Sequence, residues 1–594
     1  MNGSNIGRVI LITSRAVTHT DDFNVIRHLQ HIVRTQLDNA ARGNNFGQKT
    51  SILGGIMGRF IDFAGARLRR FGCVVSVVAL AGTAIPASVQ AQVTAFRQAV
   101  AETAARDDDV AAFYRSRNFE GIWSGDSAMG HRNALLSALE NAGHHGLPTN
   151  RYDVASLIAQ MQSARTPAEL GEIEVLLTKT FLQYARDVQS GVLRPKSVDP
   201  MIVREVTYTP RVDLLTEFRS SNPTTFLRSL PPSTPEYTRL VAAKLRLETQ
   251  QATGGWGPVV NAEKLEAGAT GTEVIALRNR LVAMGYLERS VTATYDAQIV
   301  EAVRAFQRSH GLQEDGTAGP STIAEINRPI SERLQSIVVA MERERWFSQD
   351  KGDRHVWVNL TDFSAKVVDF GQVTFSTRSV IGAVDPDRET PEFSDIMEYM
   401  VINPSWYVPR SIVTKEYLPQ MQRNRGAAGH LLITDRNGRT VNRANIDFNR
   451  YNARNFPFSM RQPPSSRNAL GLVKFMFPNQ YNIYLHDTPA KSLFGREVRA
   501  YSHGCIRLND PFDFAYALLA KQSDNPEELF QSRLRTGNES RVTLDEAVPV
   551  HLVYRTAFTT NTGDVEFRRD IYGRDRKIWN ALTREGVVVP GVQG

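Results

Sequence analysis

Hydrophobic positions between residues 92 and 250 recur at helical spacing. Leu177, Phe181 and Tyr184 repeat in this way and are followed by Gly191. Apolar residues three and four positions apart line one face of a helix, and a glycine just beyond them marks its end. The pattern predicts a helical region that acts as a structural scaffold.

A smaller helical unit follows a glycine-rich linker at residues 251–258. Val274, Leu277 and Leu281 line one predicted helix face, and Phe306 belongs to the next helix. The spacing predicts a compact helical module of its own.

After Gly352 the apolar pattern changes from helical to alternating. Val356, Val358 and Leu360 alternate with other residues, which is typical of half-buried strands. Strand patterns are also expected at residues 471–477, 481–485 and 548–554, with a helix at residues 511–519. Residues 411–467 interrupt this region, are polar and rich in Asn and Arg, and are predicted to be an insertion that covers a site.

These patterns predict a multidomain α+β protein. A chain of 594 residues is too long for one core, so about three or four domains are expected. The expected order is a leader at 1–91, a helical scaffold at 92–250, a small three-helix domain at 259–328, a connecting scaffold helix at 331–350, a mainly-β domain at 351–570 with an insertion at about 411–467, and a C-terminal tail at 571–594.

Composition adds a basic balance to this picture. The formal net charge is +8 and the sequence pI is about 9.4, which favours an acidic partner. The sequence has no Cys/His cluster at zinc-ligand spacing, no Walker-type glycine loop and no aromatic nucleic-acid signature. An anionic envelope polymer or a membrane surface fits this charge as well as nucleic acid does.

Residues 57–92 have the features of an export signal. Three arginines precede an uncharged stretch at 71–89, and small residues up to Ala91 predict cleavage after that residue. The stretch is near the length that spans a bilayer, so an uncleaved inner-membrane anchor is the alternative. Met57 is a second candidate for the start of the chain. Both alternatives place the rest of the chain outside the cytoplasm.

Cys505 is the only cysteine outside this leader, because the other, Cys73, lies in the apolar stretch. An exported chain that loses its leader keeps one thiol without a partner in its own chain, which favours a reactive group over a disulfide. A lone cysteine is nevertheless more often a small buried hydrophobic residue. The cysteine alone leaves both readings open.

Residues near Cys505 have the chemistry of a nucleophilic site. His486 ends the predicted strand at 481–485 and can accept the thiol proton if the fold brings it within hydrogen-bond distance. Gly504 allows a close backbone approach, and amides near Cys505 can form part of an oxyanion hole.

Two basic residues flank the cysteine. In an extended segment Arg507 shares a side with Cys505, where it can hold a carboxylate or favour the thiolate. An ordinary ion pair is the alternative role. His503 is constrained by the same loop and is predicted to make a structural hydrogen bond rather than act as the base.

The run "HDTPAKSLFGREVRAYSHGCIRL" closely resembles the active-site signature of L,D-transpeptidases with a YkuD-type catalytic domain. The runs "AVRAFQRSHGL" and "DGTAG" resemble the peptidoglycan-binding domain of many bacterial wall enzymes. Together with "NPSWYVP", "NALGLVKFMFPN" and "DIYGRD", the domain order is similar to the large periplasmic YcbB-type members of Gram-negative bacteria.

This resemblance implies specific roles for the site residues. It implies Cys505 as nucleophile, His486 as its base and Gly504 as orienter and oxyanion donor. Ser502, His503 and Arg507 would shape and charge the pocket, and Tyr484 would line it. The insertion at 411–467 falls where that subclass carries a capping subdomain.

The implied reaction takes place in the periplasm and uses a tetrapeptide stem of peptidoglycan as acyl donor. Cys505 attacks the carbonyl of the third residue, D-alanine leaves, and an amine of a second stem resolves the thioester into a 3-3 cross-link. The resemblance implies no metal and no organic cofactor. The partners are peptidoglycan stem peptides and glycan, with no nucleic acid, while the sequence leaves the oligomeric state open.

Three alternatives remain at this point. The first is an L,D-carboxypeptidase, in which water resolves the thioester. The second is a papain-like wall endopeptidase, in which His551, downstream of the cysteine, is the base. The third is a peptidoglycan-binding scaffold without catalytic activity.

Overall fold

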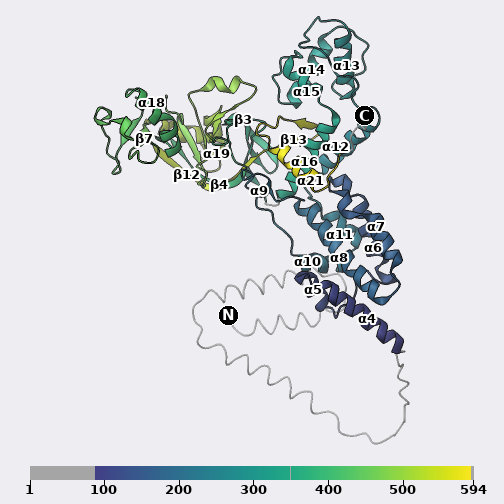
Figure 1. The fold of residues 1–594 in the computed structure, drawn as a ribbon. Coiled ribbons are helices and arrows are strands. Elements are labelled where there is room, and N and C mark those ends of the chain that lie inside the picture. The colour runs from purple at the N-terminus through teal and green to yellow at the C-terminus, as the bar shows by residue number, and fades with distance from the viewer. Residues whose placement is uncertain (1–86, 348–349, 590–594) are drawn as a thin grey trace, which may run out of the picture. The chain divides into compact units, whose positions relative to one another are not determined.

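The computed structural model describes residues 87–347 and 350–589 (Figure 1). The predicted leader lies almost wholly outside these residues. In the described ranges, no helix is both long and apolar enough to cross a membrane.

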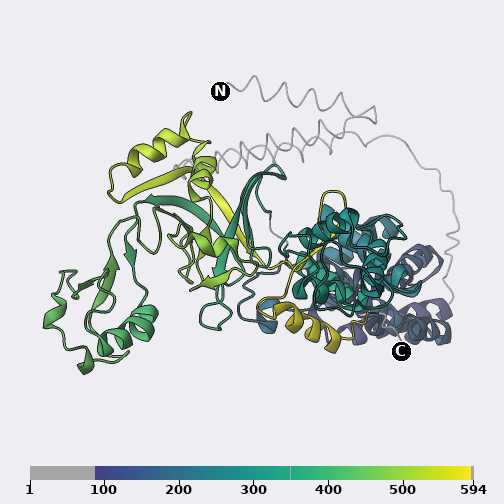
Figure 2. The same cartoon turned by 90° about the horizontal axis from the view of Figure 1, so that it is seen from above.

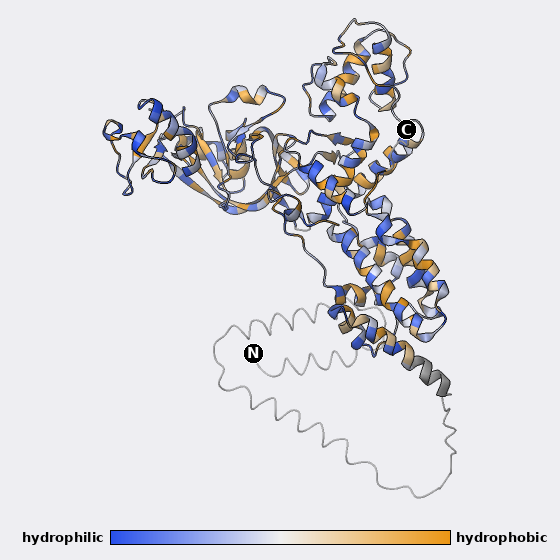
Figure 3. Cartoon of the chain, viewed as in Figure 1, coloured by the Kyte–Doolittle hydropathy of each residue, from blue (hydrophilic) through white to orange (hydrophobic). Residues whose placement is uncertain are grey.

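The first part of the described chain is helical, as predicted. Its helices are α4 (Ala87–Ala104), α5 (Asp108–Arg115), α6 (Met129–Glu140), α7 (Val154–Ser163), α8 (Pro167–Ser190), α9 (Pro195–Val198), α10 (Arg211–Ser220), α11 (Pro223–Ser229) and α12 (Pro235–Ala252). Orange and blue residues are interspersed along these helices in Figure 3, as expected for helices that mix apolar and polar positions.

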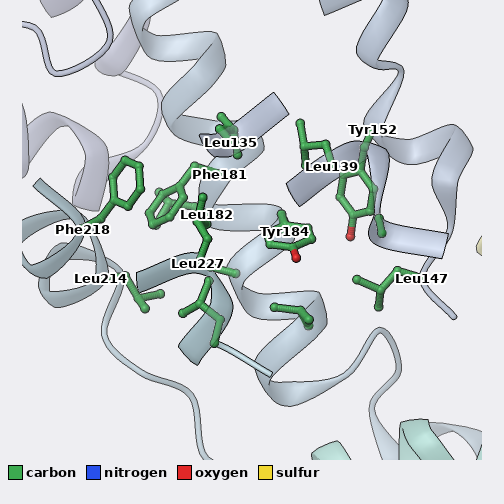
Figure 4. Packing of buried hydrophobic residues seen from close by; sticks show 14 of the residues in the cluster. Leu135, Leu139, Leu147, Tyr152, Phe181, Leu182, Tyr184, Leu214, Phe218 and Leu227 are labelled. Atoms are coloured by element: carbon green, nitrogen blue, oxygen red, sulfur yellow. The ribbon is translucent and has the colours of Figure 1, made fainter. Parts of the chain in front are cut away.

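Helix α8 lies at the centre of this helical core. It begins at a capping box in which the side chains of Thr166 and Glu169 bond each other's backbone, and it ends before Gly191. The rings of Phe181 and Phe218 stack with centroids 4.5 Å apart (Figure 4). Aromatic contacts of this kind bury a large apolar area, so they hold α8 and α10 together.

Three short helices, α13 (Thr272–Ala283), α14 (Ala297–Ser309) and α15 (Pro320–Ile326), form the predicted module. Val274, Leu277, Leu281 and Phe306 are all fully buried in a core of its own. The expectation of a small three-helix module is therefore confirmed.

Helix α16 (Ile330–Trp346) carries charged side chains that are buried but paired. Arg343 lies 2.6 Å from Glu392 and 2.8 Å from Asp575, and burial of such a charge requires these partners. These ion pairs join α16 to the residue that precedes strand β4 (Phe393–Ile402) and to the last helix, α21 (Arg574–Arg584), which packs against it (Figure 1).

Residues 571–594 were expected to be a C-terminal tail, but they contain the packed helix α21. Ile578 and Leu582 of α21 are fully buried in the same core as the scaffold helices. Their spacing of four residues places both on one helix face, a signal that the polar residues around them obscured.

The second half of the chain is built on a nine-stranded sheet in the order β10-β3-β11-β9-β8-β4-β12-β1-β2, and β2 and β3 at or near its two ends also pair with each other. Figure 1 labels β3, β4 and β12 of this sheet, and Figure 2 shows the same region from above. The strands are β1 (Arg354–Asn359), β2 (Ser364–Asp369), β3 (Gln372–Gly382), β4 (Phe393–Ile402), β8 (Val473–Met476), β9 (Leu485–His486), β10 (Ala500–Ser502), β11 (Ile506–Leu508) and β12 (Ser540–Val553). Helices α19 (Pro511–Leu519) and α20 (Pro526–Leu534) follow β11, and a small hairpin of β13 (Ala557–Thr559) and β14 (Val565–Phe567) follows β12.

The strand predicted at residues 481–485 is mostly a turn. The side-chain oxygen of Asn479 accepts hydrogen bonds from the backbone of Tyr481 (3.0 Å) and Ile483 (3.2 Å). Asn482 has a φ of 54°, which no strand residue adopts. The alternating pattern was misleading here because the Asn479 side chain competes with strand pairing for these amides.

Residues 406–470, hereafter the cap, lie in the chain between β4 and β8 and include the insertion expected at 411–467. They contain a three-stranded sheet of β5 (Trp406–Tyr407), β6 (Leu432–Thr434) and β7 (Ser459–Gln462), with α17 (Arg410–Ile412), a π-helical turn (Val413–Tyr417) and α18 (Leu418–Arg423). The cap has its own hydrophobic core, which extends from Trp406 to Leu470.

Candidate active site

Parallel pairing of β9 and β11 brings the predicted catalytic residues together. Leu485 pairs with Ile506 and His486 with Arg507, while the amide of Ile506 donates to the carbonyl of Tyr484 (3.0 Å). Leu485 and Ile506 are fully buried in the core of the sheet. Because alternate residues of a strand share a face, the neighbouring side chains extend to the opposite side.

These side chains line one cavity of about 1330 Å³ between the sheet and the cap. Six of the seven predicted site residues contribute to its wall, and the seventh, Gly504, lies beneath it in the loop that carries Cys505. The six are Tyr484, His486, Ser502, His503, Cys505 and Arg507. The cap contributes Tyr407, Arg410, His430 and Arg467, among others.

The half-buried thiol of Cys505 donates to the carbonyl of Asn482 at 3.4 Å. Burial raises the pKa of Cys505 to about 11, because the thiolate would lose its hydration. Hydrogen bonds from the Tyr484 amide and hydroxyl, and the charges of Arg507 and Lys474, oppose this rise in pKa. The free protein therefore holds a neutral thiol at pH 7.

His486 is buried and donates its Nδ1 proton to the carbonyl of Asp487, at 2.5 Å. Burial, followed by repulsion from Arg507, lowers the pKa of His486 to about 3. A hydrogen bond to the backbone of Leu470 also acts on the ring. With Nδ1 protonated in the neutral ring, Nε2 is the nitrogen that carries the lone pair. In the described residues no hydrogen bond joins His486 to Cys505, so the direct contact considered from sequence is not formed in this state.

The loop before the nucleophile is held by Ser502 and Gly504. The Ser502 hydroxyl donates to the Cys505 carbonyl (2.5 Å) and accepts from the Gly504 amide (3.1 Å). Gly504 has a φ of 108°, and its carbonyl accepts from the hydroxyl of Thr390 at 2.7 Å. Since its amide is already bonded, Gly504 orients the loop, and the expected role of oxyanion donor is left to neighbouring backbone.

Arg507 is a partly buried guanidinium without a hydrogen bond or an ion pair to any described residue. Its Nε is fully buried and has no hydrogen-bond partner in the part of the chain that the structure describes. Burial lowers the pKa of Arg507, although the group stays charged at every physiological pH. The structural ion pair considered from sequence is absent among residues 87–347 and 350–589, so this cation is available to an anion that enters the cavity.

His503 makes the structural hydrogen bond that was predicted for it. Its Nε2 lies 2.6 Å from Oε1 of Glu416 in the cap, and the same oxygen accepts from Arg388 at 3.2 Å. Lys415, the residue before Glu416, lies 2.5 Å from Asp387. Two adjacent cap residues are thus bonded to the loop before β4 and to the loop of the nucleophile.

Sequence reasoning missed Asn482 and Lys474, which act on the thiol, and Glu416, which bonds His503 in the loop of the nucleophile. Asn482 contacts the thiol through its carbonyl, which leaves no sequence signal. Lys474 lies on β8 opposite His486, a pairing that depends on the strand order. Glu416 is one of few acidic residues in the cap, and this rarity was the only signal that could have identified it.

The structure does not bring His551 to the cysteine. His551 bonds Ser394 at 2.8 Å and the carbonyl of Lys351 at 3.0 Å, and it does not line the Cys505 cavity. The papain-like alternative therefore lacks its base.

Comparison with protein families assigns three parts of the chain. Residues 108–243 match a scaffold domain. Residues 270–326 match the family described as "Putative peptidoglycan binding domain". Residues 353–531, which contain the whole cavity wall from the sheet, match the L,D-transpeptidase catalytic domain.

The chain is also similar to individual proteins. A "Putative L,D-transpeptidase" of Haemophilus influenzae is 31% identical over 225 residues, which cover 38% of this chain and 45% of that protein. The chain thus matches less than half the length of this relative. Crystal structures of L,D-transpeptidases from Xylanimonas cellulosilytica (TM-score 0.17, 50% of this chain, 100% of that chain) and Stackebrandtia nassauensis (TM-score 0.20, 50% and 97%) are each 15% identical to this chain.

Residues 353–531 therefore match an L,D-transpeptidase catalytic domain, in a chain that also matches a scaffold domain and a putative peptidoglycan-binding domain.

Proposed function

We propose that this protein forms 3-3 cross-links in peptidoglycan through a thioester on Cys505. One observation carries the proposal. Strands β9 and β11, with the residue before each of them, present Tyr484, His486, Cys505 and Arg507 to one cavity. A nucleophile, a proton acceptor and an unpaired cation in one cavity are the groups that acyl transfer from an anionic peptide requires.

The unpaired guanidinium of Arg507 supports an anionic donor. A tetrapeptide stem carries free carboxylates, and a guanidinium without protein partners binds a carboxylate with charge-assisted hydrogen bonds. Arg410 and Arg467 add positive charge on the cap side of the same cavity. The donor would therefore enter between the sheet and the cap.

The attack begins from a neutral pair, because the pKa values lie near 11 for Cys505 and near 3 for His486. The thiol proton passes to Nε2 of His486 as the sulfur forms its bond to the substrate carbonyl, so a free thiolate is not required. The imidazolium then protonates the leaving nitrogen, the C–N bond breaks, and D-alanine departs from the thioester. The bond from Nδ1 to Asp487 holds the ring in the tautomer that this transfer needs.

In the second half an acceptor amine attacks the thioester. His486 takes the proton from the amine and returns it to the sulfur as the C–S bond breaks, which restores the thiol. Water could replace the amine and yield a tripeptide. The cap would favour the amine by excluding water from the thioester.

The same proposal places the protein in the periplasm, where its polymeric substrate lies. Export rests on the sequence features of residues 57–92, and binding of peptidoglycan is supported by the family match at residues 270–326.

The test uses the full chain and purified disaccharide-tetrapeptide, with the products separated by mass spectrometry. The proposal expects a dimer that has lost one D-alanine, and no dimer with Cys505→Ala. Tripeptide as the only product would identify an L,D-carboxypeptidase instead. No change with folded wild-type protein would overturn catalysis on this donor.

A further inference from the structure

The excess positive charge of the chain lies in the cap. Residues 406–470 contain ten arginines and one lysine but three acidic residues, a net charge of +8 that equals the formal charge of the whole chain. The other residues carry 59 basic and 59 acidic side chains and are balanced. A field of one sign over a single subdomain indicates an anionic partner at that place.

Within the described residues, the arginine charge of the cap is not neutralised by carboxylates, although Lys415 pairs with Asp387. Among the described residues, none of the ten cap arginines forms a salt bridge with a carboxylate. The three acidic residues of the cap have other partners. Glu416 bonds His503 and Arg388, Asp435 accepts from the backbone of Asn437 and Arg439, and Asp447 accepts from the backbone of Asn449.

Most of these arginines face solvent. Exposed arginines of the cap are Arg410, Arg423, Arg425, Arg436, Arg439, Arg450, Arg454 and Arg467. Local contacts hold their segments together, since Gln422 beside Arg423 donates to the carbonyl of Tyr451 beside Arg450, at 2.8 Å. Like charges on neighbouring segments repel each other. An anion that binds between them lowers this repulsion, which adds to its binding free energy.

The cap is continuous with the active-site cavity. Arg410 and Arg467 line the wall that faces Cys505, while Arg439, Arg450 and Arg454 lie in the cap but not in that wall. An anion that enters the cavity and extends beyond it would therefore meet further positive charge. A polymer with regularly spaced carboxylates has this property, and a soluble monomer does not.

We propose that the cap binds the carboxylates of stem peptides that neighbour the reacting stem on polymeric peptidoglycan. This inference rests on the proposed function and adds a reason for the enzyme to prefer polymer over soluble fragments. The peptidoglycan-binding family match in the same chain favours this anionic polymer over nucleic acid or anionic lipid.

The test compares two triple variants of equal charge change in the full chain. One carries Arg439→Gln, Arg450→Gln and Arg454→Gln in the cap. The matched control carries Arg106→Gln, Arg115→Gln and Arg228→Gln, three exposed scaffold arginines that form no salt bridge with any described residue. Binding is measured to insoluble peptidoglycan sacculi, to sacculi whose carboxylates are amidated, and to phosphatidylglycerol vesicles.

The cap variant is expected to bind intact sacculi roughly tenfold more weakly, because each exposed charge pair contributes a fraction of a kcal/mol up to about one. The control should bind like wild type, and salt or amidation should remove most of the difference. Equal binding by both variants, or a cap effect confined to vesicles, would overturn the inference. Turnover of soluble disaccharide-tetrapeptide is measured in parallel. This turnover tests the proposed reaction alone, so a failure of the cap inference can be told apart from a failure of the proposed reaction.

Discussion

Nε2 of His503 lies 2.6 Å from Oε1 of Glu416, which connects the loop of the nucleophile to the cap. His503 is two residues before Cys505, and Arg388 reaches the same carboxylate at 3.2 Å. A lid that excludes water must be held closed while the thioester exists. In the proposed reaction, the contact between His503 and Glu416 would hold the cap closed over the thioester.

Glu416→Gln should therefore raise the share of hydrolysed tripeptide relative to cross-linked dimer. The substitution keeps the shape of the side chain and removes its charge. Because Glu416 and His503 are partly exposed, we expect a change of about two- to fivefold in the product ratio. Mass spectrometry of the products measures it. Glu528→Gln, which breaks an exposed pair with Arg535, is the matched control and should leave the ratio unchanged.

Alkylation of Cys505 should be slow at neutral pH and accelerate up to high pH. Since burial raises the pKa of Cys505 to about 11, the thiolate fraction should rise about tenfold per pH unit between pH 7 and 10. The measurement is the rate of reaction with iodoacetamide in a Cys73→Ala background. Tyr484→Phe should slow it further, because the hydroxyl favours the thiolate. A plateau near pH 8 would contradict the neutral thiol.

His486→Ala should lower the rate of dimer formation by about 10²- to 10⁴-fold, the usual contribution of a general base. His551→Gln should retain activity, because His551 contacts Ser394 and Lys351 away from the cavity. Initial rates on disaccharide-tetrapeptide, with circular dichroism as a check of folding, compare the two. Loss of activity in His551→Gln with an intact fold would favour the papain-like alternative.

Arg507→Gln should raise KM for the tetrapeptide donor by roughly ten- to a hundredfold, the loss expected for a hydrogen bond to a charged group. Arg507→Lys should recover part of this affinity, since it restores the charge but not the planar fork. Arg576→Gln, at an exposed position of α21, is the control. An unchanged KM in Arg507→Gln would remove the donor carboxylate from this position.

Gly504→Ala should destabilise the protein by about 1–3 kcal/mol. Gly504 has a φ of 108°, and a new Cβ would lie 3.0 Å from Cδ1 of Ile483. Gly495→Ala is the comparison, because Gly495 has no atom within 4 Å of such a Cβ, and its effect should stay within about 0.5 kcal/mol. Thermal unfolding of both variants provides the test. Equal melting temperatures would mean that the loop adapts without strain.

Local sequence was sufficient for elements whose signal is a repeated apolar spacing. Helix α19 begins and ends at the predicted residues Pro511 and Leu519, and α8 ends before Gly191 as expected. Prediction from local sequence was wrong where a side chain competes with the backbone for hydrogen bonds, as at Asn479. It also missed α21, because polar residues surround the apolar residues of its buried face.

By itself the sequence determined which residues are the candidates for the chemistry, a lone cysteine with a glycine before it and two histidines within reach, because the chemistry of a side chain follows from the residue type alone. Only the tertiary structure decided how they are arranged. The order of β9 and β11 in the sheet places Tyr484 and His486 near Cys505, and in the same arrangement Nε of Arg507 has no hydrogen-bond partner among the described residues. The contact of Glu416 with His503 spans 87 residues of chain, and no local pattern encodes a pairing over that separation.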